Sequence, residues 1–234
     1  MIDTKLIMVE GIVGSGKSTT ADHIAKLISD AGKKVNLYHE YAREYPLEMY
    51  ISNLLQNNYG KQFDVQSVVR KILANDTEVD SLPHWKDISE FCLSRDEVTI
   101  IESRFWQHET MIMYLCGIDS DRILKRQQEI FEVLADNNPF LVCLANDNVV
   151  PIIEKAFAER REIWRDWITW MFAEFPYFTS RNLSGKDGMI EFYKDWNQLA
   201  EALFNQYPGA KVAMRNPHND WQTAYKTLEG ALAL

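Results

Sequence analysis

Gly11-Ile12-Val13-Gly14-Ser15-Gly16-Lys17-Ser18 fits the pattern Gly-x-x-x-x-Gly-Lys-Ser/Thr, the Walker A pattern of phosphate-binding loops (P-loops). Its glycines leave room for successive backbone N–H groups to turn inward around a polyphosphate. Lys17 brings a positive charge to the outer phosphates, and the Ser18 hydroxyl is placed to hold a magnesium ion that bridges them. The stretch therefore predicts a nucleotide-binding site, with these binding residues: Gly11, Val13, Gly14, Ser15, Gly16, Lys17, Ser18 and Thr19.

The residues on either side supply the strand and the helix that such a loop requires. Residues 6–9, Leu-Ile-Met-Val, form a short apolar run suited to a strand buried on both faces. Residues 19–31 have the pattern of an amphipathic helix, which Gly32 ends as a C-cap. The dipole at the start of this helix favours a bound anion. This context indicates phosphate binding rather than a glycine-rich turn that binds nothing.

The composition is typical of one cytoplasmic domain. The chain has 234 residues, 46% of them hydrophobic, which is enough for one large core and short for two, so we expect a single domain over residues 1–234. A net charge of -9 indicates no general attraction to nucleic acid or to an anionic membrane. Cys92, Cys116 and Cys143 lie in apolar surroundings without paired spacing, as reduced thiols do. We expect no signal peptide and no membrane span, which would need roughly 18 apolar residues.

Strand and helix patterns alternate along the rest of the chain. Further strands are predicted at 34–40, 98–101, 140–144 and 211–214. Further helices are predicted at 47–57, 65–74, 83–94, 106–115, 120–135, 149–172, 187–205 and 221–232. This alternation predicts an α/β three-layer sandwich around a five-stranded parallel sheet, the fold of P-loop nucleoside triphosphate hydrolases. Residues 47–94 form a helical insertion between two strands, which we interpret as a region that covers the substrate.

Charged side chains follow the second and third predicted strands, at the edge of a parallel sheet where ligands bind. Glu102 can orient magnesium or accept a hydroxyl proton, and Arg104 can neutralise a transferring phosphate; a surface ion pair is the alternative. Glu40 and Glu44 are candidate bases for the proton of an acceptor hydroxyl. If the acceptor is already a phosphate, no base is needed and Arg43 would bind it. A solvated helix start explains Glu40, Arg43 and Glu44 equally well.

Three arginines lie on the long predicted helix at 149–172. The spacing of four residues puts Arg161 and Arg165 on one face, and Arg160 lies beside them. We predict a mobile lid at about 157–170 that brings arginine to the transition state. The acidic residues between these arginines also fit a salt-bridged surface helix.

Other stretches narrow the class of protein. Arg215 follows the last predicted strand, where it would lie at the edge of the base of a bound nucleotide. Asn146-Asp147-Asn148 is not the Asn-Lys-x-Asp that reads guanine in GTPases, and the histidines show no metal spacing. The aromatic stretch at 163–172 is explained equally by packing in a homodimer and by burial within the monomer.

Three segments resemble the thymidylate kinases and deoxynucleoside kinases. Val9-Glu10-Gly11-Ile12-Val13-Gly14-Ser15-Gly16-Lys17-Ser18-Thr19 is similar to the opening of both families, including the glutamate before the first loop glycine. Arg43-Glu44-Tyr45-Pro46 is similar to the Arg-Glu-Pro of thymidylate kinases, with a tyrosine inserted. Ser103-Arg104-Phe105 is similar to their Asp-Arg-Tyr, with serine in place of the acid. Alternatively, Glu102-Ser103-Arg104 resembles the Glu-Arg-Ser of deoxynucleoside kinases with its last two residues exchanged.

The resemblance implies a kinase that moves the terminal phosphoryl group of ATP, as its magnesium complex, to a nucleoside or nucleotide. Ser18 and Glu102 would hold the magnesium ion, and the region of Arg161 and Arg165 takes the place of the family's lid. The departures from the family motifs leave the acceptor open. The alternatives are a kinase of a non-nucleoside hydroxyl compound and a regulatory protein that binds nucleotide without phosphorylating a small molecule.

Overall fold

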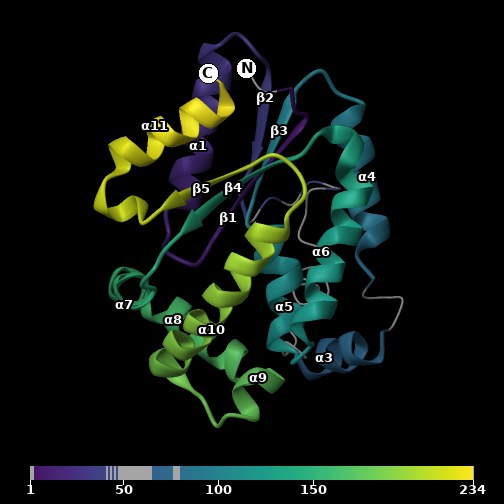
Figure 1. The fold of residues 1–234 in the computed structure, drawn as a ribbon. Helices are drawn as coiled ribbons and strands as arrows, with labels where there is room; N and C mark the ends of the chain where they lie inside the picture. The colour runs from purple at the N-terminus through teal and green to yellow at the C-terminus, as the bar shows by residue number, and fades with distance from the viewer. Residues whose placement is uncertain are drawn as a thin grey trace.

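Five parallel strands form a single sheet in the order β2-β3-β1-β4-β5 (Figure 1). The computed structural model describes residues 3–40, Ala42, Glu44, Pro46, 65–75 and 80–233. The strands are β1 (Leu6–Gly11), β2 (Val35–Tyr38), β3 (Val98–Glu102), β4 (Phe140–Ala145) and β5 (Lys211–Arg215). The predicted five-stranded parallel sheet is confirmed. The predicted helix at 47–57 and Arg43 lie outside the described residues.

β1 is the central strand, and both of its faces are buried. Leu6, Ile7, Met8 and Val9 have no exposed surface. Leu6 and Met8 belong to one hydrophobic core, whereas Ile7 and Val9 belong to a second core on the opposite face. This alternation follows from the two-residue period of a strand, and it places one layer of helices on each side of the sheet.

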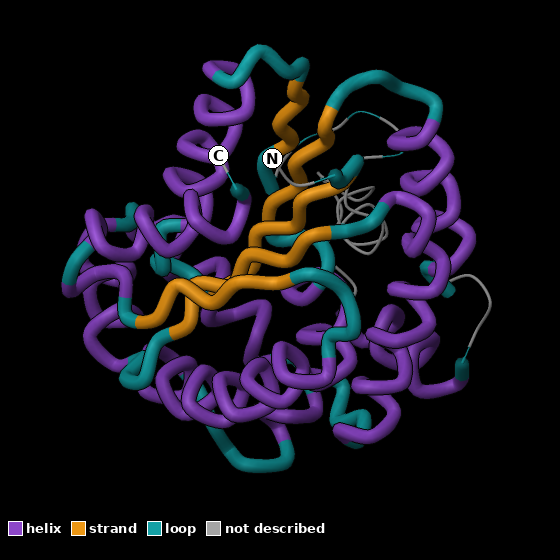
Figure 2. Tube along the Cα trace, turned by 45° about the horizontal axis from the view of Figure 1, so that its top comes forward, coloured by secondary structure: helices purple, strands orange, loops and turns teal. Residues whose placement is uncertain are grey.

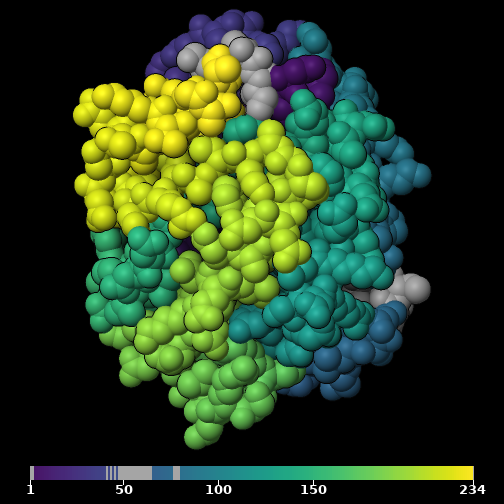
Figure 3. All heavy atoms as spheres, in the orientation of Figure 1, coloured from purple at the N-terminus to yellow at the C-terminus, as the bar shows by residue number. Residues whose placement is uncertain are grey.

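Two helices cover one face of the sheet, and the other helices of the described chain lie against its opposite face or beyond its edge (Figures 1 and 2). The first pair is α1 (Lys17–Asp30) and α11 (Trp221–Leu232). The remaining helices are α3 (Val65–Ala74), α4 (Leu82–Leu93), α5 (Met111–Leu115), α6 (Ser120–Leu134), α7 (Val150–Glu159), α8 (Glu162–Ala173), α9 (Pro176–Thr179) and α10 (Gly185–Gln206). In the space-filling view, α10 and α11 form much of the visible surface (Figure 3).

The continuous helix predicted at 149–172 is wrong, because the chain breaks between α7 and α8. Arg160 and Arg161 both have extended backbone angles, with ψ of 150° and 149°. The break is held by contacts across it: Arg165 donates a hydrogen bond of 3.0 Å to the Phe157 carbonyl, and the Trp164 ring packs edge-on against the Phe157 ring. The guanidinium thus satisfies a carbonyl that the end of α7 leaves unpaired.

The helix predicted at 106–115 also differs in detail. Its first five residues form a π-helical turn, η2 (Trp106–Thr110), which continues directly into α5. Two predicted helix starts are confirmed by their capping bonds: Asp119 accepts from the Arg122 amide, and Asp220 accepts from the Thr223 amide. None of the helices in the described ranges is both long and apolar enough to cross a membrane.

The aromatic stretch at 163–172 is buried only at its end. Met171 and Phe172 are buried, whereas 78% of Ile163 and 43% of Trp170 are exposed. Burial within the monomer therefore explains only part of this stretch, and a homodimer stays a prediction.

The packing of α11 gives a test of the fold. Leu228 has no exposed surface and lies in the core between α11 and the sheet. Leu228→Ala should lower the free energy of unfolding by about 2–5 kcal/mol, because it leaves a cavity in a packed core. Lys226→Ala, on the exposed side of the same helix, is the control. Urea denaturation of the two variants measures the difference, and equal stabilities would contradict this packing.

Candidate functional site

The phosphate loop joins β1 to α1 through glycines in left-handed backbone conformations. Gly14 has φ of 77° and Gly16 has φ of 96°. A Cβ atom on Gly16 would lie 2.5 Å from the ring of Trp221, so a side chain is excluded there by both conformation and space. No side chain caps the start of α1. Its first backbone N–H groups are therefore available to an anion.

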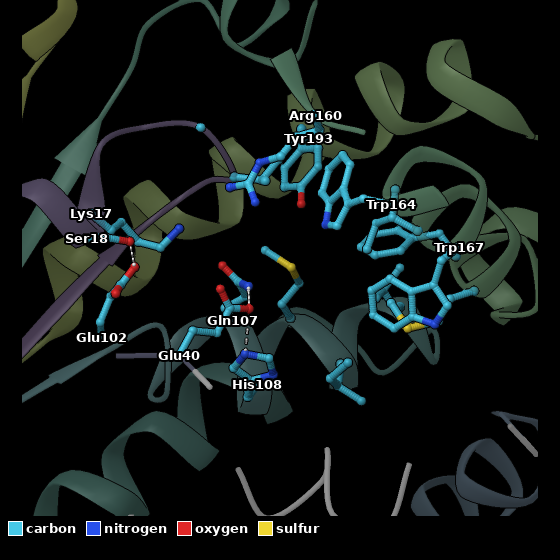
Figure 4. A pocket seen from close by; sticks show the side chains of 18 of the residues that line it. Lys17, Ser18, Glu40, Glu102, Gln107, His108, Arg160, Trp164, Trp167 and Tyr193 are labelled. Atoms are coloured by element: carbon cyan, nitrogen blue, oxygen red, sulfur yellow. Dashed lines mark hydrogen bonds and ion pairs between the residues drawn. The ribbon is translucent and has the colours of Figure 1, made fainter. Parts of the chain in front are cut away.

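Lys17 and Ser18 are the first two residues of α1, at the end of the loop. The buried Lys17 ammonium donates to the Ile12 carbonyl at 3.0 Å. The Ser18 hydroxyl donates to Glu102 at 2.7 Å, which brings the two predicted magnesium ligands together (Figure 4). Hydroxyl and carboxylate oxygens are the donors that Mg²⁺ prefers, and it usually shares its coordination with phosphate and water.

The second oxygen of Glu102 connects the site to His39 at the end of β2. His39 Nδ1 lies 2.8 Å from Glu102 Oε2, and His39 Nε2 lies 3.3 Å from Asp22 of α1. Burial alone would lower the pKa of His39, but the hydrogen bond and charge of Glu102, together with Asp22, raise it above its ordinary value. These contacts hold Glu102 in place beside Ser18. In the described part of the chain, no cluster of three or more His, Cys, Asp or Glu side chains would hold a metal ion on its own.

A cavity of about 320 Å³ opens on one side of the phosphate loop (Figure 4). Its polar end is formed by the loop and by Glu40, Glu102, Gln107 and His108. Its opposite wall is apolar and comes from α5, α8 and α10: Met111, Ile112, Leu115, Trp164, Trp167, Ile168, Met171, Phe172 and Tyr193. Such a volume and such a lining are typical of small-molecule sites.

Glu40 is one of the two carboxylates that the described chain places at the polar end of this cavity, beside Glu102. Its Oε1 atom accepts from Gln107 Nε2 at 2.7 Å and from His108 Nε2 at 3.1 Å. Burial would raise the pKa of Glu40, but the hydrogen bond and charge of His108, helped by Lys17 and Arg104, hold it below its ordinary value. The carboxylate is therefore ionised at neutral pH.

The π-helical turn η2 directs Gln107 and His108 into the cavity and its other polar side chains into the protein. Trp106 donates to Gln127 of α6 at 2.8 Å, and Arg126 of α6 donates to Glu109 at 2.9 Å. Isolated π-helical turns are frequent at functional sites because they shift the direction of successive side chains. α6 thereby anchors the turn that presents Gln107 and His108.

A second hollow lies on the other side of the phosphate loop. It is lined by Gly14, Gly16, Thr19, Lys155, Ala156, Glu159, Arg160, His218, Trp221 and Tyr225. Three of these residues form an aromatic row: the Trp221 ring packs 5.5 Å from Tyr225 and 5.2 Å from His218, measured between ring centroids. Arg160 lines both this hollow and the cavity, and its guanidinium lies over the Trp164 ring.

The structure brings several of the predicted site residues together. Lys17, Ser18, Glu102, Glu40 and Arg160 all line the cavity, together with four further residues of the loop region. The latter are Val13, Gly14, Gly16 and Thr19. Gly11 and Ser15 form the base of the loop, where the Ser15 side chain is fully buried.

Other predicted residues do not line either hollow. Arg104 is buried and donates to the carbonyls of His39 and Ala42, so it braces the end of β2. Arg161 and Glu44 are exposed. Arg165 bonds the Phe157 carbonyl, and Arg215 pairs with Glu201 and Asp147. Catalytic or binding roles for these five residues stay predictions.

Sequence reasoning missed His39, Gln107, His108, Tyr193 and the aromatic row. The signal for the first three was their position, since each stands at the end of a strand or a few residues beyond it, where a parallel sheet gathers ligand-binding groups. Tyr193 and the aromatic row come from α10 and the C-terminal segment. Nothing in their local sequence distinguishes them from core residues.

Glu10 is a fully buried carboxyl group between the phosphate loop and η2. Its Oε1 atom accepts from the Phe105 amide at 2.9 Å. Burial raises the pKa of Glu10 to about 7, although the charge of Lys17 and the backbone amides at 105–107 oppose this shift. Glu10 therefore connects the loop to the start of η2 and titrates near neutral pH.

The chain matches no protein-family model and no curated protein sequence. Among solved structures it is similar to the crystal structure of thymidylate kinase from Ehrlichia chaffeensis, with a TM-score of 0.51 and 16% sequence identity. The likeness covers 96% of this chain and 97% of that chain. This chain has a P-loop kinase fold. At such low identity the likeness concerns the fold alone.

Glu10 makes the stability of the protein depend on pH. Its pKa of about 7 in the folded state exceeds the ordinary 4.5, so the folded state binds more protons between these values and stability falls as pH rises through them. Glu10→Gln removes this effect while keeping an acceptor for the Phe105 amide. The variant should be more stable than the wild type by about 3 kcal/mol at pH 8, a difference that shrinks toward pH 4. Urea denaturation at several pH values measures it, and a difference independent of pH would contradict the assignment.

Proposed function

We propose that this chain transfers the terminal phosphoryl group of ATP to a small acceptor, a nucleoside, nucleotide or related hydroxyl compound. The observation that carries the proposal is the pair of hollows that meet at the phosphate loop and share Gly14, Gly16, Thr19 and Arg160. A transferase must hold two molecules in line across the transferring group, whereas a protein that only binds or hydrolyses nucleotide needs one site.

The hollow that contains the aromatic row fits the phosphoryl donor, ATP. With its phosphates on the loop amides and Lys17, the base of ATP would reach the hollow that contains His218, Trp221 and Tyr225. Aromatic faces stack on any nucleobase, and Arg160 at the edge of this hollow is placed to neutralise the phosphates. The acceptor would then occupy the cavity on the opposite side.

Magnesium fits the oxygen donors at the loop. Ser18 and Glu102 would hold the ion, which when bound neutralises charge on the phosphates. The contribution of the chain is positioning and electrostatics: Lys17 holds the outer phosphates, and the apolar walls from α5 and α8 exclude water from the reacting groups. Without that exclusion, ATP would be hydrolysed.

Lys17→Ala should reduce acceptor-dependent ADP formation by roughly 100- to 1,000-fold, because it removes the cation at the outer phosphates. Lys26→Ala, an exposed lysine on the same helix that pairs with Asp30, is the matched control. Coupled ADP assays with a panel of nucleosides, nucleoside monophosphates and other hydroxyl compounds measure the rate, and circular dichroism checks the fold. A Lys17→Ala protein with full activity would overturn the loop assignment. ATP binding without stimulation by any acceptor would favour a regulatory protein.

Trp221→Ala should weaken ATP binding by roughly 5- to 100-fold, because it removes a stacking surface for the base. Tripolyphosphate has no base and serves as the control ligand, so its affinity should change little. Isothermal titration with both ligands measures the two effects. Equal losses for ATP and tripolyphosphate would indicate that Trp221 supports the loop at Gly16 rather than the base.

A further inference from the structure

We infer that the acceptor is an uncharged alcohol with a planar or bulky apolar body, and that Glu40 takes the proton from its hydroxyl. This inference rests on the proposed function and concerns its acceptor cavity. The proposed function allows both nucleosides and nucleotides as acceptors. This inference restricts the acceptors to compounds that carry no phosphate at the reacting end.

The polar end of the cavity presents a carboxylate that is held in one position. In the described part of the chain, both hydrogen bonds to Glu40 fall on Oε1, from Gln107 and His108. Its Oε2 atom is thus left to accept a proton from a substrate. Figure 4 shows Glu40 among the residues that point into the cavity, between Lys17 and the tryptophans of α8. An ionised, oriented carboxylate next to the phosphate site is what a general base requires.

The charges at this end favour a neutral acceptor. Among the described residues, Glu40 and Glu102 are the carboxylates that line the cavity, and Lys17 and Arg160 are the lysine and the arginine that line it. Arg160 also lines the hollow of the aromatic row, where the proposed function assigns it to the donor phosphates. Lys17 serves the donor phosphates and Glu102 lies against Ser18, so Glu40 remains to face the acceptor. A monophosphate placed there would meet a like charge, whereas an alcohol would meet a hydrogen-bond acceptor.

The opposite end of the cavity selects for an apolar body. Trp164, Trp167 and Phe172 of α8 supply aromatic faces there. Tyr193 of α10 completes this wall as a neutral phenol, because burial and the nearby charge of Glu40 both raise its pKa. A volume of about 320 Å³ accommodates a molecule about the size of a nucleoside.

The acceptor, ATP and Glu40 account for every bond that forms or breaks in the transfer and for the proton. The acceptor oxygen forms a bond to the terminal phosphorus of ATP while its proton passes to Glu40 Oε2. The bond between that phosphorus and the bridging oxygen breaks, and ADP leaves with the electron pair. Glu40 then releases the proton to water, so the products are the phosphate ester, ADP and a proton.

The experiment compares each nucleoside with its own 5′-monophosphate, and adds primary alcohols that carry aromatic or alkyl groups. ADP formation, product mass and binding by isothermal titration are measured for the wild type, Glu40→Gln and Glu90→Gln. Glu90 is an exposed glutamate on α4, outside both hollows, and its variant is the control. MgATP binding to each protein is measured separately.

The wild type should phosphorylate uncharged alcohols and bind them at least tenfold more tightly than the matching monophosphates. Glu40→Gln should lower kcat for the alcohol by roughly 10²- to 10⁴-fold with little change in KM or in MgATP affinity. It should also reduce the discrimination against monophosphates, because the repelling charge is gone. Glu90→Gln should behave as the wild type.

Three results would overturn the inference: tighter binding of monophosphates than of their parent alcohols, an undiminished kcat in Glu40→Gln, or no binding of any alcohol in the panel. Preference for monophosphates would overturn only the acceptor class, since phosphoryl transfer would still occur. Failure of the proposed function is seen separately, as failure of the wild type to bind MgATP or to turn over with any acceptor.

Discussion

The first turn of α1 has no side-chain cap on its backbone amides, although the strand that leads into the phosphate loop is buried on both faces. The chain must therefore reverse direction within a few residues and expose its backbone amides while doing so. Left-handed glycines at 14 and 16 make this possible, and Trp221 presses against the second of them from the C-terminal segment. Because β1 is packed into both hydrophobic cores, the loop that follows it has a fixed origin. The positions of the other site residues are defined relative to this loop.

The two hollows are built from segments that are far apart in the sequence. The cavity combines the ends of β2 and β3 with α5, α8 and α10, whereas the aromatic row belongs to the C-terminal segment. Two polar residues of α6, Arg126 and Gln127, hold the π-helical turn that presents Gln107 and His108. Polar side chains within the protein are thus as important for the geometry of the cavity as those that line it.

Local patterns in the sequence were sufficient to predict the sheet, the phosphate loop and most helices. The spacing of apolar residues and the positions of glycines determine these features. They failed at Arg160 and Arg161, because apolar residues continue at helical spacing through the break. The bond from Arg165 to the Phe157 carbonyl spans the break, and no local pattern reveals it. In the site, Lys17 and Ser18 could be predicted from the pattern of the phosphate loop, and Glu40 and Glu102 from their positions after strands whose carboxyl ends lie at the same edge of the sheet. The direction of Gln107 and His108 could not, since it depends on the π-helical turn.

The break between α7 and α8 has a thermodynamic consequence. Arg160 stands at this break and lines both hollows, so a ligand in either hollow would lie next to the same side chain. A ligand in one hollow that stabilises a particular position of Arg160 thereby changes the binding free energy of a ligand in the other hollow. Linkage requires this coupling to be equal in both directions. The order in which two ligands enter therefore changes the path to the ternary complex but not its stability.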